Sequence, residues 1–195
     1  PLELRVLKDI ALSGDGEPTA EKCFTAVCRF LNQLVNQGIL VEIPLVLITN
    51  ATMFHKPRVF EALTMLMSAG GVIWGKLDAG TDAYYQTVAR SRVPFQRVLD
   101  NLSLVSQQWP IIIQTLFFDF GEGAPSDAEI EAYVAQLKNI LDGGGQIKEV
   151  HVHTVARAPG NHKAEALPVS YLNGVAEKVR LILGVSAKAI GGSAA

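Results

Sequence analysis

Short apolar runs rich in β-branched residues recur along the chain, and each is bounded by Gly, Pro, Asn or Asp. Such runs predict the strands of a sheet. The predicted strands cover residues 9–13, 45–49, 72–78, 111–118 and 149–155. Segments with helical periodicity lie between them, several opened by Ser, Thr or Pro. The predicted helices cover residues 20–37, 57–68, 81–89, 95–107, 126–141 and 167–183.

Strands that are almost continuously apolar and alternate with helices indicate an α/β fold, in which helices cover a parallel sheet. The sheet is expected to be doubly wound or curled into a complete or partial barrel. Side-chain parity favours the barrel, because Trp74, Lys76 and Asp78 share one strand face while Ile73 and Leu77 share the other. Charge therefore lies on a single face of this strand.

Polar side chains also recur near the carboxyl ends of the later strands. Gln114 lies amid apolar residues, and His151, His153 and Arg157 share one face of the strand that contains them. Ligands of parallel α/β proteins bind outside the carboxyl ends of the strands, so this recurrence predicts a central site. For any one of these residues, a contact with solvent or neighbouring backbone is an equally good explanation.

Composition limits the class of protein. The 195 residues are 49% hydrophobic and 18% charged, which is typical of a globular chain. We expect one domain over residues 1–186 and a flexible tail over the Ala- and Gly-rich residues 187–195. The net charge of −2 offers no general basic field for nucleic acid. No apolar run is long enough to span a bilayer, so we expect a cytoplasmic protein without membrane partners.

Residues that often bind metals are poorly placed for it here. Cys23 and Cys28 would lie about 140° apart around a helix, which suits neither a disulfide nor one metal site, so packing is expected. His151 and His153 supply two ligands without a clear third, and no metal site is predicted. The acidic start of helix 126–141, which includes Glu129, is interpreted as a solvated face favoured by the helix dipole.

The segment over residues 10–19 carries the most information about function. An apolar strand runs into the loop Ser13-Gly14-Asp15-Gly16-Glu17 and then into a helix. The glycines let a ligand approach the backbone, and the Glu17 carboxylate is placed to accept hydrogen bonds from an ammonium group. A tight turn with Glu17 at a helix N-terminus is the alternative explanation, and local physics leaves it open.

Ser-Gly-Asp-Gly-Glu-Pro-Thr at residues 13–19 resembles the strand-two motif with which radical S-adenosylmethionine (SAM) enzymes bind the methionine amino group of their cofactor. The resemblance extends over roughly residues 8–185, because the strand ends that carry Asn50, Lys76, Gln114 and His153 follow in the family's order. It implies a partial (β/α) barrel of parallel strands that lacks its first strand.

The resemblance also implies a chemistry and a set of ligand contacts. Family members cleave SAM reductively to a 5′-deoxyadenosyl radical, as Fe–S oxidoreductases that use a 4Fe–4S cluster and an electron donor such as flavodoxin or ferredoxin. The residues that would bind the cofactor are Ser13, Gly14, Asp15, Gly16, Glu17, Asn50, Lys76, Asp78, Gln114 and His153. Catalytic residues and the substrate are not predicted.

The chain departs from the family in one respect. Family members hold the cluster with a Cys-x3-Cys-x2-Cys loop after the first strand, and this chain contains no such triplet. We therefore expect the chain to be a fragment without the cluster-binding loop, inactive by itself, whose parent protein carries the loop upstream of Pro1. A lost first strand would expose a sheet edge, which predicts a homodimer or poor solubility.

Two other functions stay open at this point. Lys76 would form a Schiff base in an aldolase-like enzyme if an apolar barrel lowered its pKa. The chain would otherwise be a non-catalytic relative that binds a nucleoside or a partner protein.

Overall fold

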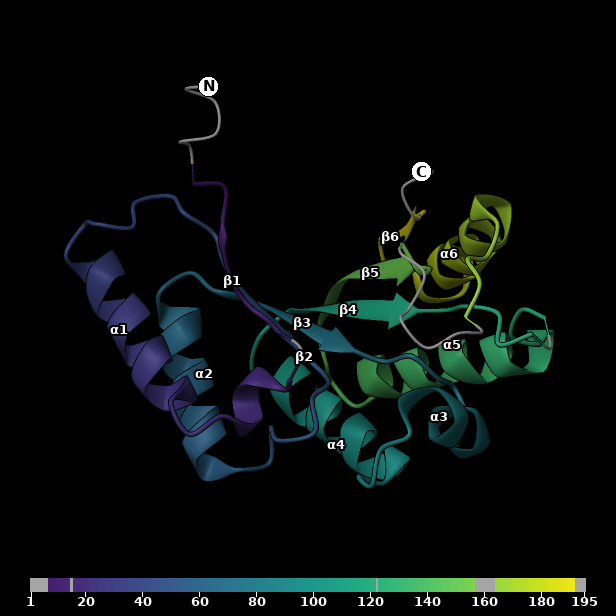
Figure 1. The fold of residues 1–195 in the computed structure, drawn as a ribbon, viewed down its shortest axis with the longest axis horizontal. Helices are drawn as coiled ribbons and strands as arrows, with labels where there is room; N and C mark the ends of the chain where they lie inside the picture. The colour runs from purple at the N-terminus through teal and green to yellow at the C-terminus, as the bar shows by residue number, and fades with distance from the viewer. Residues whose placement is uncertain (1–6, 15, 122, 157–163, 192–195) are drawn as a thin grey trace. The chain divides into compact units, whose positions relative to one another are not determined.

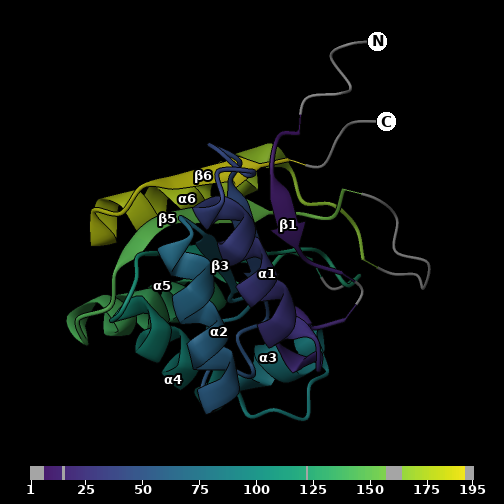
Figure 2. The ribbon, with the colours of Figure 1, turned by 90° about the vertical axis from the view of Figure 1, so that its left-hand side faces the viewer.

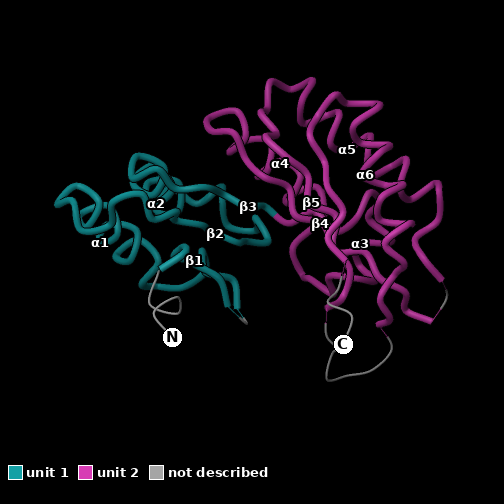
Figure 3. The backbone as a smooth tube through the Cα atoms, turned by 90° about the horizontal axis from the view of Figure 1, so that it is seen from above, with its two compact units in different colours: residues 1–75 teal, residues 76–195 magenta. Residues whose placement is uncertain are grey.

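The computed structural model describes residues 7–14, 16–121, 123–156 and 164–191. The chain divides into two compact units, residues 1–75 and residues 76–195 (Figure 3). Each unit is described by itself. The prediction of one domain over residues 1–186 stays a prediction, because two compact units can belong to one domain.

The first unit contains three parallel strands and two long helices (Figure 1). Along the chain these elements are β1 (Ile10–Leu12), the short 3-10 helix η2 (Pro18–Ala20), α1 (Phe24–Asn36), β2 (Leu45–Thr49), α2 (Pro57–Ser68) and β3 (Val72–Lys76). Neighbouring strands pair in sequence order, β1-β2-β3. Helices α1 and α2 pack side by side (Figure 2).

Apolar burial holds the first unit together. In β2, Leu45, Leu47 and Thr49 are buried and alternate with half-buried residues, as expected for a strand covered mainly on one face. Helix α2 buries Leu63 and Leu66 completely. Truncation of such a residue to Ala typically lowers stability by about 2–5 kcal/mol, so these buried side chains contribute much of the unit's stability.

The second unit repeats the alternation of strands and helices. Its elements are α3 (Asp82–Ala89), α4 (Phe95–Ser106), β4 (Ile111–Leu116), α5 (Asp127–Asp142), β5 (Ile147–His153), α6 (Val169–Leu183) and β6 (Ala187–Ile190). The strands pair in the order β4-β5-β6, all parallel. Thr81 and Ser126 cap α3 and α5 with their hydroxyl groups, as the sequence signals predicted.

These observations confirm the α/β class, with parallel strands that alternate with helices. The predicted tail over residues 187–195 is wrong at its start, because Ala187–Ile190 forms β6 and pairs with β5. A strand between Gly184 and Gly191 that contains two alanines has weak β propensity, and pairing with a neighbour outweighs it. Residues 192–195 lie outside the described residues.

Candidate functional site

The glycine loop after β1 is held in place by the carboxylate of Glu17. Glu17 Oε1 accepts hydrogen bonds from the Thr19 backbone N–H at 3.1 Å and from the hydroxyl groups of Thr19 and Thr49. Glu17 Oε2 accepts one from the Asn50 backbone N–H at 2.7 Å. This carboxylate therefore caps η2 and also joins the loop to the end of β2, while Oε2 keeps a second lone pair for a ligand.

The end of β2 beside this carboxylate is a tight turn. Asn50 Oδ1 accepts hydrogen bonds from the Thr52 backbone N–H at 3.1 Å and from the Thr52 hydroxyl at 2.7 Å. Ala51 is buried with φ 60°, in the left-handed region that non-glycine residues rarely adopt. Such backbone persists where surrounding contacts fix it, and it is common at ligand sites.

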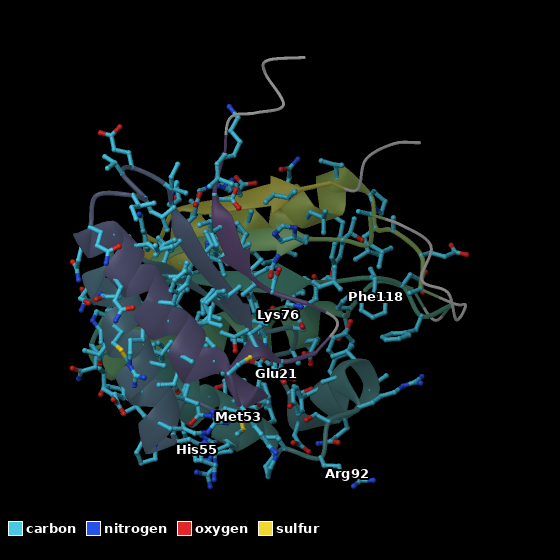
Figure 4. All side chains as sticks on the ribbon, turned by 60° about the vertical axis from the view of Figure 1, so that its left-hand side comes forward. Glu21, Met53, His55, Lys76, Arg92 and Phe118 are labelled. Atoms are coloured by element: carbon cyan, nitrogen blue, oxygen red, sulfur yellow. The ribbon has the colours of Figure 1, made fainter. Side chains whose placement is uncertain are left out.

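A hollow of about 260 Å³ opens beside the loop. Its wall combines exposed glycine backbone, two carboxylates and the apolar start of α1. The lining residues are Ala11, Leu12, Ser13, Gly14, Gly16, Glu17, Pro18, Glu21, Cys23, Phe24 and Val27. All of them belong to the first unit, and Figure 4 labels Glu21. The hollow suits a small cationic group with an apolar extension.

A second group of predicted residues, Lys76, Asp78, Gln114 and His153, belongs to the second unit. The Leu77 backbone N–H donates to Gln114 O at 3.0 Å, so residues 76–78 lie along β4. Gln114 is in register with His151, and Leu116 with His153. Because Leu77 is buried and Lys76 is exposed, Lys76 and Asp78 share a face with Gln114 and His153. We call these four residues the strand-end face.

Asp78 is anchored with one oxygen. Its Oδ1 accepts the Leu116 backbone N–H at 2.7 Å. Loss of hydration raises the pKa of Asp78 to about 6, although the Leu116 N–H and the charge of Lys76 act in the opposite direction. The carboxyl group therefore changes charge close to neutral pH.

This pKa predicts a pH-dependent effect of Asp78→Asn on stability. A carboxyl whose pKa is higher in the folded state binds protons more tightly there, so its stabilising effect is lost as pH rises from about 4 to about 6. Asparagine cannot ionise and keeps an acceptor oxygen for Leu116. We expect Asp78→Asn to be more stable than the parent at pH 7, with the difference gone at pH 4. Urea denaturation at both pH values measures it, and a constant difference would contradict the assignment.

Gln114 and His153 present polar atoms that are buried without a hydrogen-bond partner among the described residues, Oε1 and Nε2 respectively. Burial lowers the pKa of His153, and the positive charges of His151, Lys188 and Lys76 lower it further. Glu149 lies on the same strand face and contacts two of these neighbours, with Oε2 2.6 Å from His151 Nε2 and 3.1 Å from Lys188 Nζ. The lowered pKa favours the neutral form of the His153 ring.

Sequence reasoning missed the carboxylate that fixes the loop after β3. Glu129, interpreted above as part of a solvated face, is buried at the start of α5. It accepts hydrogen bonds from the Gly80 and Thr81 backbone N–H groups and from the Thr81 hydroxyl. Asp127 and Glu131 are exposed, as expected. On a helix, residues two positions apart point in different directions, so Glu129 does not share a face with Asp127 or Glu131. This spacing is the sequence feature that distinguishes the buried acid from the exposed ones.

The predicted site residues thus fall into two groups. Glu17 and Asn50 meet in the first unit beside Ser13, Gly14 and Gly16, and the strand-end face lies in the second unit. Asp15 and Arg157 lie outside the described residues. Thr49, which joins Glu17 to β2, was not predicted.

The cysteines and histidines give no cluster site in the described part of the chain. No group of three His, Cys, Asp or Glu residues is placed there to hold a metal ion. Cys23 is exposed and Cys28 is buried, neither forms a disulfide, and burial raises the pKa of Cys28 to about 11. These residues do not fit a 4Fe–4S cluster. Lys76 is exposed, so the apolar surroundings that a Schiff-base lysine needs are absent around it.

Within the same described ranges, no helix combines the length and the apolar character that crossing a membrane requires.

Comparison with known proteins finds similarity in structure. No protein-family model matches the chain, and no curated protein sequence matches it. Among solved structures, it is similar to the crystal structure of a radical SAM methyltransferase from Sphaerobacter thermophilus, with a TM-score of 0.60 and 15% sequence identity. The match covers 99% of this chain and 53% of that chain, so this chain spans about half the neighbour's length. At this identity the likeness shows the fold alone.

Proposed function

We propose that this chain is the SAM-binding core of a radical SAM enzyme, and that the cofactor's methionine end binds in the hollow beside Glu17. The placement of the Glu17 carboxylate carries the proposal. It lies beside the glycine backbone at a strand carboxyl end, and its Oε2 has accepting capacity left. Such a carboxylate can accept a hydrogen bond from an ammonium group.

Charge supports the same ligand. SAM carries an ammonium, a sulfonium and one carboxylate, so its net charge is positive. The hollow is lined by two carboxylates, Glu17 and Glu21, and the cations Lys8 and Lys22 are not among its lining residues. The attraction is stronger in a partly enclosed hollow than in open water. The apolar side chains of Leu12, Phe24 and Val27 suit the methylene groups of the methionine part.

The family's radical chemistry needs a cluster that the described residues do not hold, so what these residues do is limited to binding and orienting the cofactor. Backbone at Gly14 and Gly16 contacts the amino-acid part, and Glu17 fixes the ammonium group. When bound, SAM supplies the sulfonium whose reductive cleavage the family catalyses.

Isothermal titration calorimetry of the chain tests the proposal. We expect SAM to bind with a Kd below about 1 mM, and S-adenosylhomocysteine to bind several-fold more weakly because it lacks the sulfonium charge. Equal affinities would mean that the carboxylates do not recognise the charge. Absence of binding by both ligands would refute the proposal.

A further inference from the structure

The two candidate sites differ in charge. The hollow of the first unit has carboxylates in its wall, whereas the strand-end face of the second unit presents the exposed ammonium group of Lys76. Lys76 forms no ion pair or hydrogen bond with another described residue. The charge of Lys76 acts on Asp78 of the same face, which is anchored by the Leu116 backbone N–H. A ligand of net positive charge, such as SAM, is suited to the hollow, whose wall has carboxylates and no ammonium group. The strand-end face, which presents an ammonium group, therefore suits a different ligand.

The basic side chains around His153 indicate the sign of that ligand. Glu149 forms a salt bridge with Lys188 and contacts the His151 ring. Lys76 makes no salt bridge with a described residue, and its charge acts on Asp78 of the same face without a direct contact. The side chains that lower the pKa of His153 are all basic, and two of them are the lysines Lys76 and Lys188. A carboxylate or phosphate group bound near Lys76 would balance them.

The buried polar atoms indicate a second feature of the ligand. Gln114 Oε1 only accepts hydrogen bonds, so a ligand group that satisfies it is a hydroxyl or an N–H donor. His153 Nε2 also lacks a partner among described residues, and a neutral imidazole nitrogen can accept or donate. Buried polar atoms without a partner are rare in native proteins, and ligand sites are one place where they occur.

An aromatic pair adjoins this face. The Phe117 backbone N–H donates to His153 O at 3.0 Å, so the β4–β5 ladder continues past the last residue of β4. Phe118 and Phe120 follow, both half-buried, with ring centroids 4.2 Å apart. Figure 4 labels Phe118 and Lys76. These rings offer an apolar surface for the body of a small molecule.

We propose that the strand-end face binds the substrate of this protein, an organic acid with a hydrogen-bond donor beside its acid group and an apolar body. Lys76 pairs with the acid group, Gln114 and His153 bind the neighbouring donor, and Phe118 contacts the apolar part. The term substrate rests on the proposed function above, whereas the binding itself does not. The resemblance to radical SAM enzymes instead assigned Lys76, Gln114 and His153 to the cofactor. The two assignments therefore predict different effects of a Lys76 substitution on SAM binding.

Mandelate is a suitable probe because it carries a carboxylate, an adjacent hydroxyl and a phenyl ring. Phenylacetate lacks the hydroxyl, and benzyl alcohol lacks the acid group. In NMR titrations of the full chain that follow the His153 ring signals, we expect mandelate to bind with a millimolar Kd, phenylacetate more weakly, and benzyl alcohol not measurably. Inorganic phosphate is the control for a site that binds any anion. If phosphate binds as tightly as mandelate, the proposed substrate class is wrong.

Two lysine variants test the assignment. Lys76→Gln is expected to weaken mandelate binding by about tenfold or more. Lys148→Gln is the matched control, because Lys148 is an exposed lysine of β5 with the parity of the opposite face, and it should leave the affinity unchanged. Equal losses in both variants would show a general charge effect and refute the site.

Calorimetry with SAM separates this proposal from the proposed function. If the strand-end face binds the substrate, Lys76→Gln keeps the parent affinity for SAM while its mandelate binding falls. If SAM affinity falls as much as mandelate affinity, Lys76 serves the cofactor and the inference is wrong. If the chain does not bind SAM but binds mandelate in a way that depends on Lys76, the site is upheld and only the proposed cofactor is refuted.

Discussion

Replacement of Gly80 by alanine is expected to destabilise the protein by about 3 kcal/mol, because the backbone of α5 lies where the new methyl group would be. A Cβ at this position would lie 2.1 Å from the Tyr133 backbone nitrogen and 2.6 Å from Glu129 O. These neighbours belong to a helix and cannot rotate away. Thermal unfolding should show a midpoint lowered by about 6–12 °C.

Gly174→Ala is the control for this prediction, since it makes the same change inside α6. Apart from its chain neighbours and the backbone of its own helix, no described atom lies within 4 Å of a Cβ built at Gly174. Alanine should therefore be neutral or raise stability by about 0.5–1 kcal/mol through its better helix propensity. If Gly80→Ala unfolds at the same temperature as Gly174→Ala, the close approach between the β3–α3 loop and α5 does not exist in solution.

Elements bounded by strong local signals were predicted well from the sequence. Residues 45–49 and 57–68 match β2 and α2 at both ends. Pro44 and Asn50 flank β2, Pro57 opens α2, Gly70 follows its end, and the apolar period is unbroken within each element. Other elements are shorter than predicted. Residues 9–13 give only Ile10–Leu12, because strand pairing stops where the glycine loop begins.

Contacts between distant residues could not be predicted in the same way. The carboxylate of Glu129 joins the loop at Gly80, 49 residues away, and Glu17 meets Thr49 across 32 residues. Periodicity shows which face of an element is apolar, but it does not show which polar group a buried carboxylate will find. For Glu129 the acidic neighbours Asp127 and Glu131 gave a misleading signal, because they are exposed while Glu129 points inward.

The same limit applies to the candidate site. The sequence supplied the residues of the glycine loop and of the strand ends, because glycines and polar residues after apolar runs stand out. It left open whether Glu17 caps a helix or binds a ligand. The structure shows that Glu17 caps η2, and its second oxygen keeps the ligand role possible. Only variants that separate the two roles can decide between them.

Glu17→Gln is expected to weaken SAM binding by about tenfold or more, because the amide has no charge to pair with the ammonium group. The amide oxygen can still accept the hydrogen bond from the Thr19 backbone N–H, so η2 keeps its cap. The NH2 group then faces the Asn50 backbone N–H and cannot accept from it, so some stability is lost as well. Calorimetry with SAM measures the affinity, and urea denaturation of the same samples measures stability.

Thr19→Val is the matched control, because it removes the hydroxyl that donates a hydrogen bond to Glu17 Oε1 and leaves the carboxylate itself in place. Thr19 is fully buried and valine has nearly the same shape, so we expect stability to fall by about 1–2 kcal/mol and SAM affinity to change little. If Glu17 only caps the helix, both variants should lose stability and both should keep the parent affinity for SAM. Glu17→Gln with parent affinity for SAM would therefore assign Glu17 to the fold alone and remove the observation on which the proposed function rests.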